Sequence, residues 1–160
     1  MFPITPVNDD EDLYRCVWYD EGENRVGLYV TEPDGTVKFS SQVFNDRRQR
    51  PSVDRATLCG HEPKHAQKKP SAGVTAVLAG KIRVLGPFDQ SAPGKVIEKV
   101  IVDVEHKPIK DDPNEPDNLA HAEIFTQPVC SGNVFRKVRE ALALLANDRG
   151  WLIKPGSPPN

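Results

Sequence analysis

The segment over residues 44–58 holds a dense group of side chains that could bind an anion. It contains four arginines around a Pro51-Ser52 corner: Arg47, Arg48, Arg50 and Arg55. Guanidinium groups present flat, forked sets of donors that match phosphate and carboxylate. Asp46 and Asp54 stand among these arginines, so the segment is equally typical of a solvated loop with internal ion pairs. Both interpretations of this arginine corner stay open.

A second group of titratable side chains lies in His121-Ala122-Glu123-Ile124. Alternation predicts a strand over residues 121–127, on which His121 and Glu123 share one face. A carboxylate beside an imidazole stabilises the protonated ring, which prepares a proton donor. A surface ion pair would need the same two residues, and this alternative stays open. His106 ends an apolar row and fits a hydrogen-bonded residue at the edge of the core.

Three potential zinc ligands occur within seven residues, at Cys59, His61 and His65. Zinc accepts both sulfur and imidazole, but structural sites space their paired ligands by two to four residues. No second cysteine pair accompanies the group, and a fourth ligand would have to come from a distant part of the chain. The sequence therefore predicts an ordinary polar loop here and no metal site.

Several common catalytic motifs are missing from the chain. It contains no Gly-x-Ser-x-Gly elbow, no Gly-x-x-x-x-Gly-Lys phosphate loop and no Gly-x-Gly-x-x-Gly turn. These absences disfavour the classical nucleotide-binding folds. Aromatic and basic groups that could stack a base alternate along the first two predicted strands, at Tyr14, Arg15, Trp18, Tyr19 and Arg25. Aromatic residues in a strand are also typical of a core.

Three dispersed residues complete the list of candidates: Arg15 in Leu-Tyr-Arg, Ser52 in Arg-Pro-Ser-Val-Asp-Arg and Glu123 in His-Ala-Glu-Ile. Their order, a first-strand Arg, a mid-chain Ser and a late Glu, resembles the layout of ADP-ribosyltransferase-like domains, in which such residues surround NAD. The resemblance implies that Arg15 contacts the phosphates and that Ser52 shapes the nicotinamide pocket. It also implies that Glu123 stabilises positive charge developing on the ribose of NAD, the substrate.

Composition sets the class of protein that must position these residues. The chain has 160 residues, 38% of them hydrophobic, which suffices for one domain with its own core. A net charge of -2 argues against a surface that binds nucleic acid or membrane over its whole extent. Fifteen prolines and eleven glycines predict many turns between short strands.

The three cysteines are far apart, which argues against a disulfide framework and predicts a reducing, cytoplasmic compartment. The first residues lack the basic start and continuous apolar core of a signal peptide. No run approaches the roughly 18 to 20 apolar residues that a spanning helix needs. We therefore expect a protein that does not enter a membrane.

Periodicity and β-branched or aromatic residues predict six extended segments: residues 13–19, 25–31, 36–44, 73–86, 95–109 and 121–127. Glu-Pro-Asp-Gly at residues 32–35 predicts a tight turn that joins the second and third segments into a hairpin. The strand before Gly80 is almost wholly apolar, which predicts a central position in the sheet. Gly80 itself fits a bulge.

A 3.6-residue repeat of apolar positions predicts an amphipathic helix over residues 133–149 that covers one face of the sheet. Ser131 or Asn133 can cap its start, and Gly150 fits its end. Residues 151–153, Trp-Leu-Ile, are expected to fold back onto the body.

The remaining segments are loops or stay ambiguous. Residues 52–58 fit either a short edge strand or a helical turn, and residues 59–72 predict a long polar loop. Residues 110–118 are acidic, carry two prolines and predict an exposed loop. Residues 1–11 and 154–160 are expected to be flexible ends.

Together these features predict a single α+β domain, in which a mainly antiparallel, curved sheet is covered by the C-terminal helix. One functional hypothesis is a small cytoplasmic enzyme, a transferase or another activity, that acts on a nucleotide, NAD or RNA. Its anion-binding residues are Arg15, Arg50 and Arg55, and its catalytic residues are Ser52, His121 and Glu123. The alternative is a non-catalytic module that binds a protein partner through the arginine corner and the acidic loop at 111–117. An enzyme requires that the distant residues converge on one cleft, whereas a docking module does not.

Overall fold

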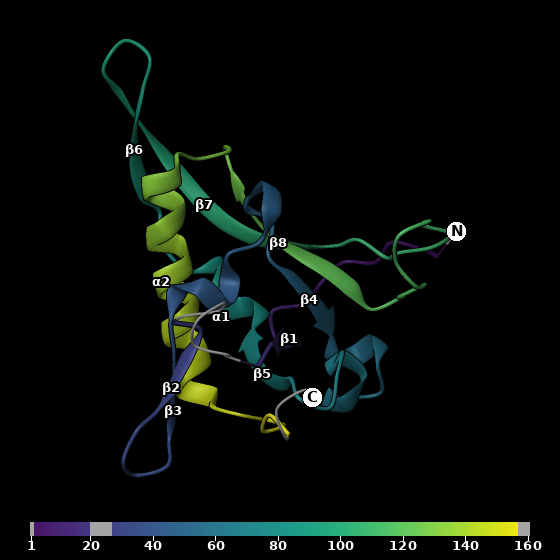
Figure 1. The fold of residues 1–160 in the computed structure, drawn as a ribbon. Coiled ribbons are helices and arrows are strands. Elements are labelled where there is room, and N and C mark those ends of the chain that lie inside the picture. The colour runs from purple at the N-terminus through teal and green to yellow at the C-terminus, as the bar shows by residue number, and fades with distance from the viewer. Residues whose placement is uncertain (1, 20–26, 157–160) are drawn as a thin grey trace.

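The fold of the chain is α+β, as the sequence predicts, with one curled antiparallel sheet and one long C-terminal helix (Figure 1). The structure is a computed structural model that describes residues 2–19 and 27–156. Within these residues no helix combines the length and the apolar composition that crossing a bilayer requires.

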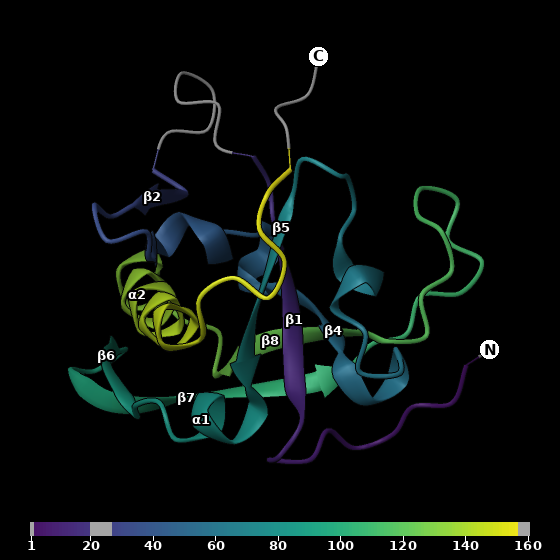
Figure 2. The same ribbon diagram turned by 90° about the horizontal axis from the view of Figure 1, so that it is seen from below.

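Six strands form the main sheet, and every neighbouring pair is antiparallel. In spatial order they are β5 (Gly73–Leu78), β1 (Asp12–Val17), β4 (Ser52–Arg55), β8 (His121–Gln127), β7 (Val96–His106) and β6 (Phe88–Ala92). Figure 2 shows β7 and β8 running across the direction of β1 and β5, so the sheet is strongly curled. The strands predicted at 13–19, 95–109 and 121–127 are confirmed as β1, β7 and β8.

The helix α2 (Gly132–Arg149) confirms the predicted amphipathic pattern. Its buried positions recur every four residues and include Val134, Val138, Leu142 and Ala146. This stripe packs against β5 and the segment over residues 37–44. Ser131, and not Asn133, caps the start, because its hydroxyl accepts from the N–H of Val134 at 3.3 Å.

The predicted hairpin is confirmed, with shorter strands: β2 (Tyr29–Thr31) pairs with β3 (Val37–Phe39) around the turn at 32–35. The strand predicted over 36–44 ends at Phe39 because Ser40 caps a 3₁₀ turn, η1 (Ser41–Phe44), with its hydroxyl. The strand predicted over 25–31 begins with residues 25 and 26, which lie outside the described residues. Trp151 meets the rings of Tyr29 and Phe39 edge-on, which confirms that the segment after α2 folds back onto the body.

The prediction that β5 is central is wrong, because β5 is an edge strand that pairs with β1. Its apolar character has another cause. The helix α2 covers one face, and residues after the helix cover its outer edge through a bridge between Val74 and Ile153. Gly80 is not a bulge but lies in the short helix α1 (Ala79–Arg83), where a Cβ would come within 2.9 Å of the carbonyl oxygen of Asp9.

The ambiguous segment over residues 52–58 contains both predicted structures in succession. The strand β4 is followed by a 3₁₀ turn, η3 (Ala56–Leu58). The edge position that we considered for this strand is wrong, since β1 and β8 hydrogen-bond to its two sides. The polar loop over 59–72 contains a further 3₁₀ turn, η4 (Pro63–Ala66), and the acidic loop over 110–118 is exposed along most of its length.

The lead-in over residues 5–11, expected to be flexible, is held against the body. Arg55 is 3% exposed and donates all five of its N–H groups: two to the Glu11 carboxylate, two to Thr5 and one to the Pro6 carbonyl. The His106 ring bonds the Thr5 N–H and the Leu119 carbonyl, in keeping with its predicted place at the edge of the core. A buried guanidinium requires such partners, so the burial of Arg55 fixes the lead-in. Residues 157–160 lie outside the described residues.

Candidate functional site

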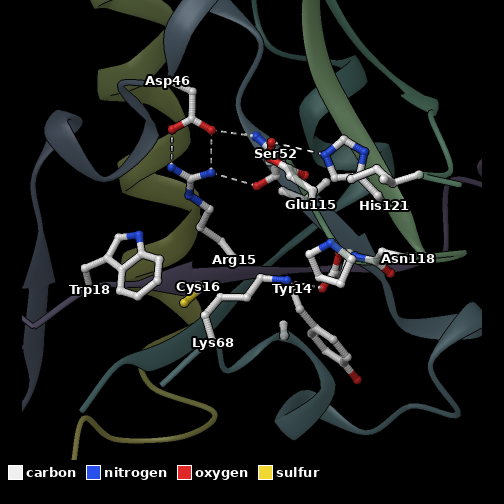
Figure 3. A pocket seen from close by; sticks show the side chains of 15 residues that line it. Tyr14, Arg15, Cys16, Trp18, Asp46, Ser52, Lys68, Glu115, Asn118 and His121 are labelled. Atoms are coloured by element: carbon white, nitrogen blue, oxygen red, sulfur yellow. Dashed lines mark hydrogen bonds and ion pairs between the residues drawn. The ribbon is translucent and has the colours of Figure 1, made fainter. Parts of the chain in front are cut away.

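A pocket of about 450 Å³ opens on the face of the sheet that β1, β4 and β8 form (Figure 3). The strand register places Tyr14 opposite Asp54 and Asp54 opposite His121, so these three side chains form one row across three strands. Ser52 is two residues before Asp54 on β4 and therefore points to the same face. Lys68 and the acidic loop complete the lining of the pocket.

Arg15 forms part of the pocket wall, with its guanidinium fully engaged. Nη1 and Nη2 donate to the two carboxylate oxygens of Asp46 at 2.8 and 2.6 Å. Nε and Nη2 donate to the Val43 carbonyl at 3.0 and 2.7 Å, and Nη1 donates to the Ser52 carbonyl at 2.7 Å. A guanidinium has five N–H groups, and here each one has a protein acceptor. Arg15 therefore acts as a clamp between β1, β4 and the segment over 43–46.

Asp46 completes this clamp around the backbone of Ser52. Its carboxylate accepts from the Ser52 N–H at 2.8 Å while Arg15 binds the Ser52 carbonyl, so both backbone polar groups of Ser52 are held. Burial alone would raise the pKa of Asp46, but the hydrogen bonds and charge of Arg15 outweigh that effect and hold the pKa below its ordinary value. The Asp46 carboxylate is therefore charged at neutral pH.

Ser52 and His121 form a hydroxyl–imidazole pair. The Ser52 Oγ lies 3.2 Å from His121 Nε2, and His121 Nδ1 lies 2.7 Å from the carbonyl oxygen of Lys107. A carbonyl only accepts, so Nδ1 must carry a hydrogen, and Nε2 of the neutral ring is then the acceptor for the Ser52 hydroxyl. This arrangement of hydroxyl, base and orienting acceptor is the one that proton abstraction from an alcohol requires.

Glu123 lies directly opposite Ser52 on β8, and Glu105 on β7 lies opposite Glu123. Arg50 joins the two carboxylates: its Nε donates to Glu123 at 2.5 Å, and its Nη2 pairs with Glu105. The guanidinium also stacks 5.1 Å from the centre of the Phe125 ring. Arg50 of the arginine corner thus holds the carboxylate of Glu123, the cross-strand partner of Ser52.

A second pocket adjoins the first and shares Asp46, Ser52 and Glu115 with it. Four cationic side chains line this second pocket: Arg47, Arg48, Arg50 and Lys107. Arg47 and Arg48 are exposed, and neither forms a side-chain hydrogen bond or ion pair with another described residue. Glu115 of the acidic loop faces them, so the arginine corner and the acidic loop border one opening.

The structure thus brings most of the predicted site residues together. Ser52, His121 and Glu123 lie on one face of neighbouring strands, with Arg50 bound to Glu123. Arg15 lines the same pocket, whereas Arg55 lines neither pocket and points to the opposite face of β4. The anion-binding roles of the arginines stay predictions, and in Arg15 and Arg55 they would require that internal hydrogen bonds break.

Sequence reasoning missed Asn118 and treated Asp54 only as a partner of the arginines. Asp54 Oδ1 accepts from Asn118 Nδ2 at 2.9 Å, while Asp54 Oδ2 is buried and has no hydrogen-bond partner. Lys68 Nζ is 3.8 Å from this oxygen, too far for a hydrogen bond. The available signal was the alternation of Ser52 and Asp54, which places both on one face of a strand.

The potential zinc ligands Cys59, His61 and His65 lie in the polar loop over 59–72, where the sequence predicts no metal site. Over the described ranges 2–19 and 27–156, no three His, Cys, Asp or Glu side chains are grouped as metal ligands. Cys59 donates to the Arg55 carbonyl at 3.1 Å, and His65 Nε2 lies 3.2 Å from Asn118 Oδ1. Burial, helped by the negative charge of Asp54, raises the pKa of the Cys59 thiol to about 11.

Comparisons with models of protein families, with curated proteins and with solved structures give no match to this chain. The resemblance to ADP-ribosyltransferase-like domains therefore stays a prediction.

Proposed function

We propose that the chain is an enzyme that acts on a nucleotide-type substrate, such as a free nucleotide, NAD or RNA, with Ser52 and His121 as its reaction centre. The observation that carries the proposal is the 3.2 Å contact between Ser52 Oγ and His121 Nε2, with Nδ1 held by the Lys107 carbonyl. Polar pairs of this kind at the floor of a pocket are candidates for acid–base chemistry.

The two adjoining pockets suit the two halves of a nucleotide. The first has the size of a small-molecule site and combines the aromatic rings of Tyr14 and Trp18 with polar groups, which suits a nucleoside. The second carries the exposed guanidinium groups of Arg47 and Arg48, which suit phosphate oxygens. Ser52 lines both pockets, so a nucleotide that spans them would place its sugar–phosphate linkage at the hydroxyl.

The chemistry follows from the hydrogen-bond pattern. His121 Nε2 takes the proton of Ser52 Oγ, and the oxygen forms a bond to phosphorus while the bond to the leaving group breaks. The leaving oxygen takes the proton back from Nε2, and a water then repeats the sequence to release Ser52. Arginines beside the phosphate would stabilise the charge that develops on its oxygens. The backbone clamp of Arg15 and Asp46 keeps the hydroxyl in place during these steps.

The ADP-ribosyltransferase-like layout supplies a variant of the same proposal. There the bond that breaks is the glycosidic bond of NAD, and Glu123 stabilises the positive charge on the ribose. Glu123 is suitably close to Ser52, since the two residues are cross-strand partners. Release of nicotinamide from NAD would identify this variant, whereas cleavage at phosphorus would leave the nicotinamide attached to its ribose.

Thermal-shift measurements with NAD, single nucleotides and short RNA test the binding, because a ligand that prefers the folded state raises the melting temperature. Turnover of the ligand found is then measured in Ser52→Ala and His121→Gln. We expect a loss of about 10²-fold or more in each. Ser91→Ala, on exposed β6, is the control and should retain activity. Full activity in Ser52→Ala, or no shift with any ligand, would refute the enzyme and leave the protein-binding module.

A further inference from the structure

The carboxylate of Asp54 is an unusual feature of the first pocket. Its side chain is only 6% exposed, yet Oδ2 has no hydrogen-bond donor. The other oxygen, Oδ1, is bound to Asn118 Nδ2. Asn118 cannot turn to serve both oxygens, because its own Oδ1 accepts from the Ala120 N–H at 3.1 Å and lies 3.2 Å from His65 Nε2. The network around Asp54 therefore leaves Oδ2 as an open acceptor.

A buried carboxylate oxygen that lacks a hydrogen-bond donor costs free energy that folding must offset elsewhere. A ligand that donates a hydrogen bond to this oxygen would explain why the fold retains an acceptor without a donor. Arg15 and Arg55, on the same two strands, have every N–H paired, so the local fold is able to satisfy its buried polar groups. Asp54 lines the first pocket between its cross-strand partners Tyr14 and His121, which line it too.

The neighbouring ammonium of Lys68 adds a second element of recognition. Its Nζ is 3.8 Å from Asp54 Oδ2 and its side chain is 48% exposed, so the group can swing to a ligand. An acceptor and a donor side by side are complementary to a ligand edge that carries a donor next to an acceptor. The Watson–Crick edge of guanine presents N1–H and N2–H₂ as donors beside O6 as the acceptor.

We propose that Asp54 and Lys68 read a guanine base in this pocket, Asp54 Oδ2 accepting from the N–H donors of the base and Lys68 Nζ donating to O6. The proposal rests on the proposed function, since it names the base of the nucleotide-type substrate. Adenine fits less well, because its N1 is an acceptor and would face the carboxylate. The substrate class is then a guanine nucleotide or an RNA with an accessible guanine.

The test compares binding of GMP, IMP and AMP to the wild-type chain and to Asp54→Asn by isothermal titration. The asparagine keeps the acceptor for Asn118 but replaces the open oxygen by a donor. We expect wild type to bind GMP about 10-fold or more tightly than AMP, with IMP between them because it lacks the N2 amino group. Asp54→Asn should lose this preference, with a drop of about 10-fold or more for GMP.

Two controls separate a role in recognition from a structural one. The melting temperature of Asp54→Asn without ligand should stay close to that of wild type, because the substitution keeps the acceptor for Asn118 and Lys68 is too far from Oδ2 for a hydrogen bond. Asp89→Asn, an exposed residue paired with Lys99 on the β6–β7 hairpin, should leave both binding and stability unchanged. A lower melting temperature for Asp54→Asn would mark Asp54 as structural and overturn the proposal.

The outcomes also distinguish this proposal from the proposed function. If none of the three nucleotides, NAD or RNA binds to wild type, the nucleotide-type substrate itself is refuted. If a nucleotide binds but GMP and AMP bind equally, or Asp54→Asn binds GMP as wild type does, only the assignment of guanine fails.

Discussion

The clamp between Arg15 and Asp46 should be a principal source of stability around Ser52, and its removal by Arg15→Met tests this directly. The side chains of Arg15 and Asp46 are only 12% and 27% exposed. Removing one partner of a buried pair costs about 3–5 kcal/mol, because the other charge is left unpaired. In Arg15→Met, Asp46 keeps its hydrogen bond from the Ser52 N–H and is partly in contact with water. We therefore expect the free energy of unfolding to fall by about 2–3 kcal/mol.

Urea denaturation followed by tryptophan fluorescence measures this loss, and the melting temperature should fall by about 5–10 °C. A double-mutant cycle with Asp46→Asn should give a coupling of about 1–2 kcal/mol. The control is the exposed pair of Arg136 and Glu140 on α2, one turn apart, for which we expect about 0.3–0.5 kcal/mol. Equal couplings in the buried and the exposed pair would contradict the argument.

The pH dependence supplies a second check on the same pair. In wild type the pKa of Asp46 lies below its ordinary value, so the charged carboxylate stabilises the fold above about pH 4 and loses this effect as the pH falls through the folded pKa. In Arg15→Met only burial and the Ser52 N–H remain, and burial raises the pKa. Protonation of Asp46 at low pH then removes a charge that has lost its partner, and this stabilises the variant. The difference in stability between wild type and variant should therefore shrink between pH 7 and pH 3, and a constant difference would refute the reasoning.

Two further predictions concern packing and thiol reactivity. Gly73→Ala should destabilise the fold by about 1–3 kcal/mol, since a Cβ would lie 2.3 Å from the Trp151 ring. At Gly132 a Cβ meets no neighbouring atom, so Gly132→Ala should change stability by less than about 0.5 kcal/mol. Urea denaturation measures both variants, and equal losses would contradict this prediction. Cys59, with a pKa of about 11, should react slowly with iodoacetamide at pH 8 in the native state and quickly in denaturant, as peptide mapping would show; rapid native labelling at pH 8 would contradict the raised pKa.

Elements whose own periodicity determines their burial were predictable from sequence. The helix α2 and the strands β7 and β8 carry complete local patterns, and they lie where those patterns place them. The position of β5 was not predictable, because an apolar strand can be covered by neighbouring strands or by a helix and a returning chain end. Periodicity reports burial but not which element causes it.

The site was predictable only in part for a related reason. The shared face of His121 and Glu123 follows from alternation within one strand, and the register of β8 confirms it. The contact of His121 with Ser52 depends instead on the pairing of strands that are about 70 residues apart in sequence. The role of Arg15 could not be predicted from sequence either. The residues next to Arg15 in the chain are the same whether its guanidinium pairs with Asp46 or faces a ligand.

What the fold leaves unpaired is the strongest guide to what it binds. Arg15 and Arg55 have every N–H group bonded to an acceptor of their own chain, so either could bind a ligand only if internal hydrogen bonds broke. Around Ser52, the groups without a hydrogen-bond partner among the described residues include an acceptor on one side, at Asp54, and donors on the other, at Arg47 and Arg48. In our proposal a nucleotide carries the complementary set, with N–H donors on its base and acceptors on its phosphate, and its linkage between the two would lie at the Ser52 hydroxyl, 3.2 Å from His121 Nε2.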